Sequence, residues 1–557
     1  MNCKLGLMLA GAAGAALAGG SALAADLPSR KAASVEYVKI CDVYGRGFYY
    51  IPGTNTCLKV GGRVRFELGW HRAQNTWIQA GNARAGLIAP TNTAGVGQAS
   101  IGVTDANGGL IVAGATPLFP LIYAGPTGAA GFANTATAGY FSGARQDTLG
   151  WRSRAYVNMD ARTQTAWGTV QTVFSISLRS RSGIFNGNPL TGPGGQNTAS
   201  PQVYAAYIRF AGFTFGRAPW LFSSNGLGPQ TYWTNFSGGS AIGTMQISYT
   251  AVFGGGFSAT IGLEDKDEHG RQRTAGGTFT NVVTDGVTLT PTFANLTWAG
   301  VTPNRLPNAV LVLRLDQGWG HVRVSGAVGQ NYAVYNNNNG FIAPVTAMRT
   351  VRKTGWAVGA DAQINLPQLA RGDALYLYVA YANGLIDYPL GGNAINGSVA
   401  KDGRISGGYN PTHNNINTYA CATANQVITA VCTQNSTALA AMVGFRHYWT
   451  PNLRSNFAVS YASINPGKAA NRVDWYMLGG QPKSTVWQGT ASLIWSPTAG
   501  FDIGLELYYA RITNKLACGG LGTYCTPWGH PALSPNTVGV AQNPTDFSVK
   551  LRVERTF

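Results

Sequence analysis

Long apolar runs are absent from this sequence beyond its first two dozen residues. No later stretch reaches 18 consecutive apolar residues, and a helical membrane span needs about 20. Charge is scarce as well, because only 11% of the 557 residues are Asp, Glu, Lys or Arg, against about 25% in an average globular protein. These absences exclude helical spans, so strands are the only way for this chain to cross a bilayer.

The sequence also lacks any stretch rich in proline or charge that could link separate domains. Its length alone would suggest several domains. Residues typical of strands and turns are abundant, with 74 Gly, 25 Tyr and 14 Trp. The missing linkers therefore favour a single large β-domain with long loops.

Acidic residues are few, with 22 Asp and Glu against 40 Lys and Arg. Such an excess of positive charge can indicate nucleic acid or anionic lipid as a partner. Many of the basic residues stand singly at alternate positions of predicted strands and do not form runs. An inward-facing positive surface fits this pattern better, and we expect no nucleic-acid partner.

Cysteine is sparse, and one of the seven, Cys3, lies in a segment that we expect to be removed. Six cysteines allow 15 connectivities. Metal ligation is the alternative, but no pair has C-x-x-C spacing and no histidine lies close enough to complete a zinc site. The short spacings favour three local disulfides in an oxidising compartment, and we expect neither metal nor cofactor. The predicted pairs are Cys41 with Cys57, Cys421 with Cys432, and Cys518 with Cys525.

The first 24 residues have the features of a secretory signal peptide. Lys4 precedes an apolar run over residues 5–18, and Ala22-Leu23-Ala24 forms a small-x-small cleavage site. We expect residues 25–56 to form an N-terminal periplasmic segment that leads into a barrel over residues 57–557.

The last 13 residues predict a strand with two different faces. Phe547, Val549, Leu551, Val553 and Phe557 share one face, and polar or charged residues alternate with them. An edge strand of a soluble β-sandwich would show the same alternation. A long terminal strand of this kind would otherwise be an exposed edge, so it is best explained as the closing strand of a barrel with lipid outside and water inside.

Strand signals recur along the chain as hairpins. The first predicted strand spans 58–71. Later strands are joined in pairs by short turns, as at 149–160 with 170–179 and at 204–210 with 213–217. Including the last strand, sixteen are predicted, an even number as single-chain bacterial barrels require. Short turns on one side and long loops on the other indicate a transmembrane barrel, since a sandwich has no reason to separate them. The longest insertion, 72–145, has no assigned role.

The segment from Val35 to Arg65 closely resembles the N-terminal signature of the alphaproteobacterial porin family. The resemblance includes Cys41, the Gly-Phe-Tyr-Tyr-Ile-Pro-Gly-Thr segment at 47–54 and Cys57-Leu-Lys-Val-Gly-Gly at 57–62. Further similar stretches lie at 162–168, 206–217 and 446–454. The resemblance implies an all-β, 16-stranded antiparallel transmembrane β-barrel with short periplasmic turns and long extracellular loops. It also implies a homotrimeric outer-membrane porin.

Strand phase then predicts which charges line the pore. Basic residues outnumber acidic ones on the inward phase, so we expect the pore to favour anions. The alternative is that these charges neutralise one another across strands and select nothing. The predicted lining residues are Lys59, Arg63, Arg65, Glu67, Arg152, Arg154, Asp160, Arg179, Arg314, Arg323, Lys550 and Arg552.

Porins usually fold their third outer loop inward, and here that loop spans 217–243. It has no acidic residue and is rich in aromatics, which departs from the usual pattern. We expect it to constrict the pore through aromatic side chains or to use them as anchors against the wall, and the loop 72–145 is a rival plug. The aromatic residues are Trp220, Phe222, Tyr232, Trp233 and Phe236.

The expected function is passive diffusion of small hydrophilic solutes, and a channel specific for a sugar or small anion is the alternative. The sequence has no HExxH, GxSxG or P-loop motif, so a barrel-borne hydrolase is a remote alternative. An adhesin that uses the long loops is another remote alternative, and it is compatible with a pore. The expected partners are outer-membrane lipid, lipopolysaccharide, two further copies of the chain, and the outer-membrane assembly machinery through Phe557.

Overall fold

The structure is a computed structural model of the 557-residue chain. The residues that it describes are 40–72, 76–79, 103–104, 110–111, 138–141, 148–185, 201–222, 232, 243–266, 277–285, 288–298, 305–336, 348–390, 416–422, 428–467, 483–515 and 545–557. The predicted signal peptide and most of the insertion 72–145 lie outside these ranges.

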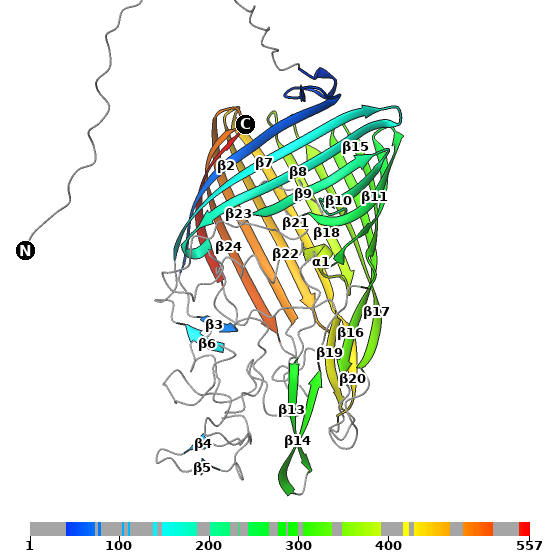
Figure 1. Ribbon diagram of the computed structural model, residues 1–557. Helices are drawn as coiled ribbons and strands as arrows, with labels where there is room; N and C mark the ends of the chain where they lie inside the picture. The colour runs from blue at the N-terminus through cyan, green and yellow to red at the C-terminus, as the bar shows by residue number, and fades with distance from the viewer. Residues whose placement is uncertain are drawn as a thin grey trace, which may run out of the picture.

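Sixteen strands form one closed antiparallel barrel, which confirms the predicted fold class (Figure 1). In chain order they are β2 (Thr56–His71), β7 (Leu149–Thr165), β8 (Gly168–Arg181), β9 (Gln202–Phe210), β10 (Phe213–Ala218), β11 (Thr244–Gly254), β12 (Phe257–Glu264), β15 (Asn308–Gln317), β16 (Gly320–Asn336), β17 (Met348–Asn365), β18 (Ala374–Asn383), β21 (Thr437–Thr450), β22 (Leu453–Asn465), β23 (Lys483–Thr498), β24 (Phe501–Lys515) and β25 (Thr545–Thr556). Fifteen of them contain a strand predicted from alternation, and β25 ends at Thr556, one residue before the end of the predicted strand 545–557.

The barrel closes where the first and last strands pair. β2 pairs with β7 on one side and with β25 on the other, so neither strand leaves an open edge. Beyond β25, the N–H of Gly62 donates to the carbonyl of Phe557, and the N–H of Phe557 donates to the carbonyl of Gly62, both at 3.0 Å. The predicted role of the terminal strand in closure is thereby confirmed.

Turns and loops are segregated between the two ends of the barrel (Figure 1). The short-turn end holds two-residue connections such as Ala211-Gly212, which joins β9 to β10 with φ angles of 48° and 85°. Such positive φ values match the right-handed twist of a tight hairpin. The short-turn end also holds both termini of the barrel, and the long connections leave its opposite end.

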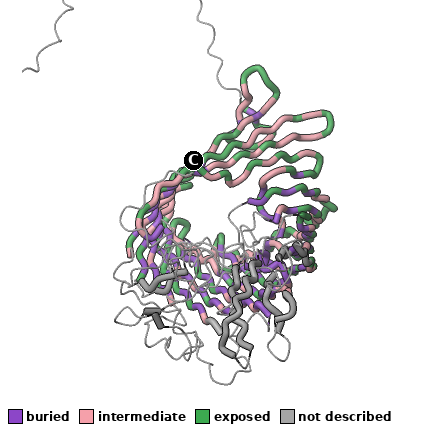
Figure 2. The backbone as a smooth tube through the Cα atoms, turned by 60° about the horizontal axis from the view of Figure 1, so that its bottom comes forward, coloured by how far each residue is buried: buried purple, intermediate pink, exposed green. Residues whose placement is uncertain are grey.

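Side chains alternate between the two faces of the wall. Outward positions are apolar and exposed, while inward positions include most of the buried charges. Tryptophans lie near both rims of the outer face, as in an interfacial girdle; Trp70, Trp151, Trp487 and Trp495 are 41–53% exposed. Viewed partly along the axis, the wall forms a ring of strands (Figure 2).

Smaller elements are attached to this ring. At the short-turn end lie η1 (Asp42–Tyr44) and β1 (Tyr49–Tyr50), which pairs with β2. The insertion 72–145 contains two described two-stranded sheets, β3 (Thr76–Gln79) with β6 (Ala138–Phe141) and β4 (Val103–Thr104) with β5 (Leu110–Ile111). Two further hairpins extend from the long-loop end, β13 (Gly277–Asp285) with β14 (Thr288–Trp298) and β19 (Ile416–Ala422) with β20 (Ile428–Asn435). There are also two helical turns, η4 (Gly183–Phe185), in which Ile184 and Phe185 are buried, and α1 (Asp387–Leu390), in which all four residues are buried. In the described part of the chain, no helix is long and apolar enough to span a membrane.

Candidate functional site: the interior of the barrel

A cluster of four cations surrounds one carboxylate on the inner wall formed by β25, β2 and β7. Glu67 is fully buried and lies opposite both Arg152 and Arg552 in strand register. Its carboxylate oxygens lie 2.6 Å from Arg152 Nε, 2.8 Å from Arg154 Nη2, 2.8 Å from Arg552 Nη2 and 4.0 Å from Lys550 Nζ. We call these five residues the Glu67 cluster.

The ion pair of Glu554 with Arg65, which lies beside the Glu67 cluster, does not cancel the positive charge of that cluster. Glu554 accepts from Arg65 and lies 3.9 Å from Arg63. Arg179 is in register with Arg154 on the adjacent strand. Positive charge therefore exceeds negative charge along this wall, because the inward positions of β2, β7 and β25 carry eight Lys or Arg residues against four carboxylates, those of Glu67, Asp160, Asp546 and Glu554.

The loop 219–243 reaches this wall through Tyr232. The N–H of Tyr232 donates to Glu506 Oε1 at 2.7 Å, and its carbonyl accepts from Lys550 Nζ at 2.7 Å and Arg552 Nη2 at 2.9 Å. The Arg552 guanidinium also lies 4.1 Å from the centroid of the Tyr232 ring. A Cβ on Gly504 would lie 1.9 Å from the Tyr232 hydroxyl, so this tip packs directly against β24.

The start of the same loop is held by a different wall. The N–H of Leu221 donates to Glu264 Oε1 at 2.5 Å. Arg323 donates to the carbonyls of Leu221 and Phe222 at 3.4 and 3.3 Å, and it forms an ion pair of 2.6 Å with Asp361. Trp220 and Phe222 are buried at this anchor. The start of the loop and its tip at Tyr232 are thus both held by charged groups of the barrel.

The two anchors lie on opposite sides of the barrel. β12, which carries Glu264, is eight strands from β24, which carries Glu506, in either direction around the sheet. The loop between β10 and β11 therefore crosses the bore. Constriction of the pore by this loop stays a prediction, and Trp233 and Phe236 lie outside the described residues.

A second inserted segment follows β18, and it is not expected from strand alternation. Leu385, Ile386, Tyr388 and Leu390 are all buried. The Tyr388 hydroxyl donates to Glu264 Oε2 at 3.0 Å, and its ring centroid lies 4.9 Å from that of Phe222. Burial raises the pKa of the Tyr388 phenol well above its usual range, so it stays a donor. An apolar run directly after a strand, Gly-Leu-Ile-Asp-Tyr-Pro-Leu at 384–390, was the available signal, because a solvated loop has no need of it.

The other predicted lining residues lie nearer the short-turn end. Lys59 is exposed, with its ammonium 5.8 Å from the Phe48 ring. Asp160 pairs with Arg162 at 2.8 Å, and Arg314 pairs with Asp316 at 2.7 Å. Part of the wall charge is therefore neutralised locally, as the alternative reading required. The role of these residues as pore lining stays a prediction.

One of the three predicted disulfides is present. Cys41 and Cys57 are bonded and buried beside Phe48 at the short-turn end. Cys421 and Cys432 lie on the paired strands β19 and β20, and Cys518 and Cys525 fall outside the described residues. The latter two pairings stay predictions.

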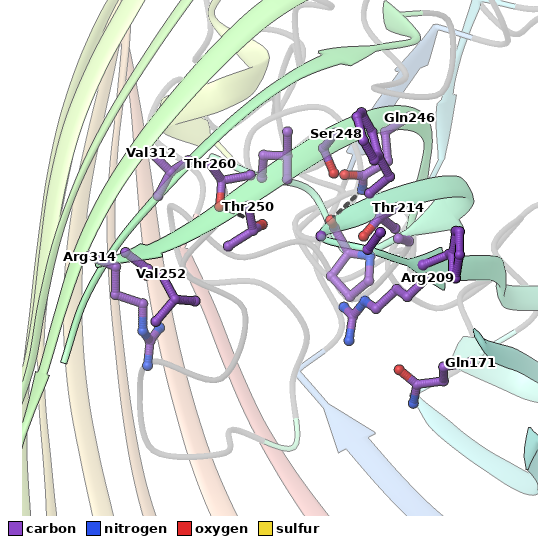
Figure 3. Close-up of a pocket in the computed structure, with 18 of the residues that line it drawn as sticks. Gln171, Arg209, Thr214, Gln246, Ser248, Thr250, Val252, Thr260, Val312 and Arg314 are labelled. Atoms are coloured by element: carbon purple, nitrogen blue, oxygen red, sulfur yellow. Dashed lines mark hydrogen bonds between the residues drawn. The ribbon is translucent and has the colours of Figure 1, made fainter. Parts of the chain in front are cut away.

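An open cavity of about 710 Å³ lies between the loop start at Trp220 and the short-turn end. Its wall is formed mainly by β8 to β12, β15 and β16 (Figure 3). The residues that line it include four arginines and a series of hydroxyl and amide side chains. The sequence pattern predicts no role for this space.

Comparison with known proteins identifies the family. A model of a porin subfamily matches residues 26–92 and 126–531. The porins Omp2a of Brucella ovis and Omp2b of Brucella canis are 47% and 48% identical over 69 residues, 12% of this chain. That stretch spans about a fifth of these relatives, 19% and 18% respectively. The outer membrane channel DcaP of Acinetobacter baumannii is 15% identical, with a TM-score of 0.49 over 91% of this chain and 99% of that one. Because the family model matches most of the chain, this barrel belongs to the porin subfamily and is an outer-membrane protein.

Proposed function

We propose that this protein is a channel for passive diffusion of small hydrophilic solutes and that it favours anions. The observation that carries the proposal is the loop 219–243, which spans the bore between Glu264 and Glu506 and brings Tyr232 against the Glu67 cluster. A solute that passes this loop meets a wall with excess positive charge. The family and the names of its relatives point to a channel and not to an enzyme.

The anion preference follows from the position of the basic side chains whose charge is not neutralised by carboxylates. Ion pairs neutralise Arg314 and Arg323 on one side of the bore, while the Glu67 cluster keeps an excess on the other. The loop itself offers no acidic residue over 217–243. A pore lined in this way concentrates anions and repels cations.

Bilayer recording of the refolded mature protein tests the proposal. We expect discrete ohmic conductance steps in KCl, and a reversal potential of the sign set by chloride in a KCl gradient. Arg63, which faces the lumen and is about one-third exposed, is a suitable probe. We expect Arg63→Glu to lower the chloride-to-potassium permeability ratio about twofold to fivefold, because charges 4–8 Å apart interact by ~0.5–1 kcal/mol in water.

The matched control is Arg46→Glu, which reverses an exposed charge outside the barrel. This variant should leave the permeability ratio unchanged. Absence of conductance steps would contradict the channel itself. A cation-directed reversal potential would contradict only the anion preference.

The proposed assembly is a homotrimer in the outer membrane, with lipopolysaccharide around its outer leaflet. Porin family membership and the apolar outer face support it. Recognition of Phe557 by the assembly machinery belongs to the same proposal, and the 70% exposure of that side chain is compatible with it. Crosslinking of the protein in native membranes tests the trimer.

A further inference from the structure

The cavity between Trp220 and the short-turn end contains one continuous row of polar side chains. Arg162, Gln171, Arg209, Thr214 and Ser248 are successive register partners across β7, β8, β9, β10 and β11. All five line the cavity. Gln171 and Arg209 extend toward the same open space (Figure 3). Register, and not sequence proximity, therefore brings these donors and acceptors together.

Arg209 differs from the other arginines of the cavity. Among the described residues, no carboxylate lies within ion-pair distance of Arg209. Its guanidinium lies 4.7 Å from the centroid of the Tyr207 ring. It is exposed to the interior. The other three are each held by a carboxylate: Arg162 by Asp160, Arg314 by Asp316 and Arg323 by Asp361.

Hydroxyl and amide groups line other parts of the same cavity. Gln246 is buried and donates through Nε2 to the carbonyl of Pro219 at 2.7 Å. Its Oε1 is a buried acceptor with no partner among the described residues. Thr250 and Thr260 share a hydrogen bond of 2.9 Å, and each hydroxyl can still bond a ligand. The remaining bonding capacity of the Thr250 and Thr260 hydroxyls favours a hydroxylated ligand here.

The described residues that line the cavity include no Asp or Glu. Its volume lies within the ~300–1,000 Å³ of small-molecule sites. We propose that the cavity binds small polyhydroxylated monocarboxylates, that is sugar acids, with Arg209 on the carboxylate and with Thr214 and Ser248, which follow it in the row, on the hydroxyls. This inference rests on the proposed channel function and makes the channel selective for one class of anion.

The single unpaired cation and the many neutral groups decide the class. One guanidinium matches one carboxylate through two parallel hydrogen bonds. A neutral sugar would leave Arg209 without a charged partner, and a simple carboxylate such as acetate would leave the hydroxyl row unused. The site should therefore bind gluconate more tightly than either glucose or acetate.

The test uses the refolded protein in bilayers, with sodium gluconate as the probe and glucose and acetate as references. We expect gluconate current to saturate with concentration, and gluconate to block chloride current where glucose and acetate do not. In Arg209→Gln the half-saturation concentration should rise about tenfold, the ratio given by one charge-assisted hydrogen bond. Arg209→Lys should restore part of this loss.

Two further variants separate the site from general charge effects. Arg371→Gln removes an exposed charge from a turn at the same end without lining the cavity, and it should leave saturation unchanged. Ser248→Ala should weaken the block of chloride current by gluconate several-fold and should leave the response to acetate unchanged. This variant tests the site if Arg209→Gln does not fold.

The outcomes distinguish this inference from the proposed function. If the protein conducts KCl but gluconate current rises linearly and Arg209→Gln behaves like Arg371→Gln, the site is disproved while the channel stands. Equal block by gluconate and acetate would likewise overturn the sugar-acid class. If no variant and no wild-type preparation conducts, the channel fails and the inference fails with it.

Discussion

At the scale of single residues, Glu67 shows how far the barrel depends on a buried charge network. This carboxylate is the acceptor for Arg152, Arg154 and Arg552 in a wall that is almost closed to solvent. Alternation predicts that all of these side chains face inward, because the side-chain period of a strand is local. It does not predict that they meet around one carboxylate, since this depends on the register of β2 with both its neighbours.

Replacing Glu67 by Gln should destabilise the barrel by about 3–5 kcal/mol, because removing one member of a buried ion cluster leaves the others uncompensated. Urea unfolding in detergent, followed by the heat-modifiable shift in electrophoretic mobility, measures this. The matched control is Asp316→Asn, because Asp316 is half exposed in its pair with Arg314, and exposed pairs contribute about 0–1 kcal/mol. Equal losses in the two variants would refute the buried-network account.

At the scale of elements, the two inserted segments decide the shape of the bore. The loop tip at Tyr232 is accommodated only because β24 has a glycine at position 504. The segment 384–390 packs its apolar side chains on an inner wall of small residues that includes Ala357, Ala380 and Ala382. The aromatic composition of the loop 217–243 can be read from the sequence. Which strands receive it could not be predicted, because this depends on side chains that are distant in the sequence.

We expect Gly504→Val to displace Tyr232 and to increase single-channel conductance, because the new side chain takes the place of the Tyr232 hydroxyl. The comparison is Gly489→Ala on the adjacent strand, where an added Cβ meets nothing closer than 3.9 Å and conductance should not change. Conductance histograms in KCl check both. An unchanged step in Gly504→Val would show that this loop tip does not limit the flow of ions.

At the scale of the whole molecule, closure of the sheet depends on the seam where β2 meets β7 and β25. A Cβ on Gly62 would lie 2.5 Å from the Tyr156 carbonyl and 2.9 Å from the Phe557 ring. Glycine is therefore required here by the close approach of three strands, which the sequence signature at 57–62 does not explain by itself.

Gly62→Val should cost about 3 kcal/mol, at the upper end of the range for overpacking, and should lower the yield of folded barrel. Refolding yield and urea midpoint measure the effect. Gly326→Ala, where an added Cβ meets nothing within 4 Å, should refold like the parent protein. If Gly62→Val closes as readily as that control, the seam is looser than these distances imply.

The sequence by itself determined the sixteen strands, their inward and outward faces and the family. These follow from alternation over about ten residues and from local motifs, so each can be read within one strand or turn. Only the tertiary structure decided the Glu67 cluster, the loop that spans the bore, the segment 384–390 and the polar row at Arg209. The physical reason is that strand register and loop insertion join residues far apart in the chain, and no local pattern encodes which partner each side chain meets.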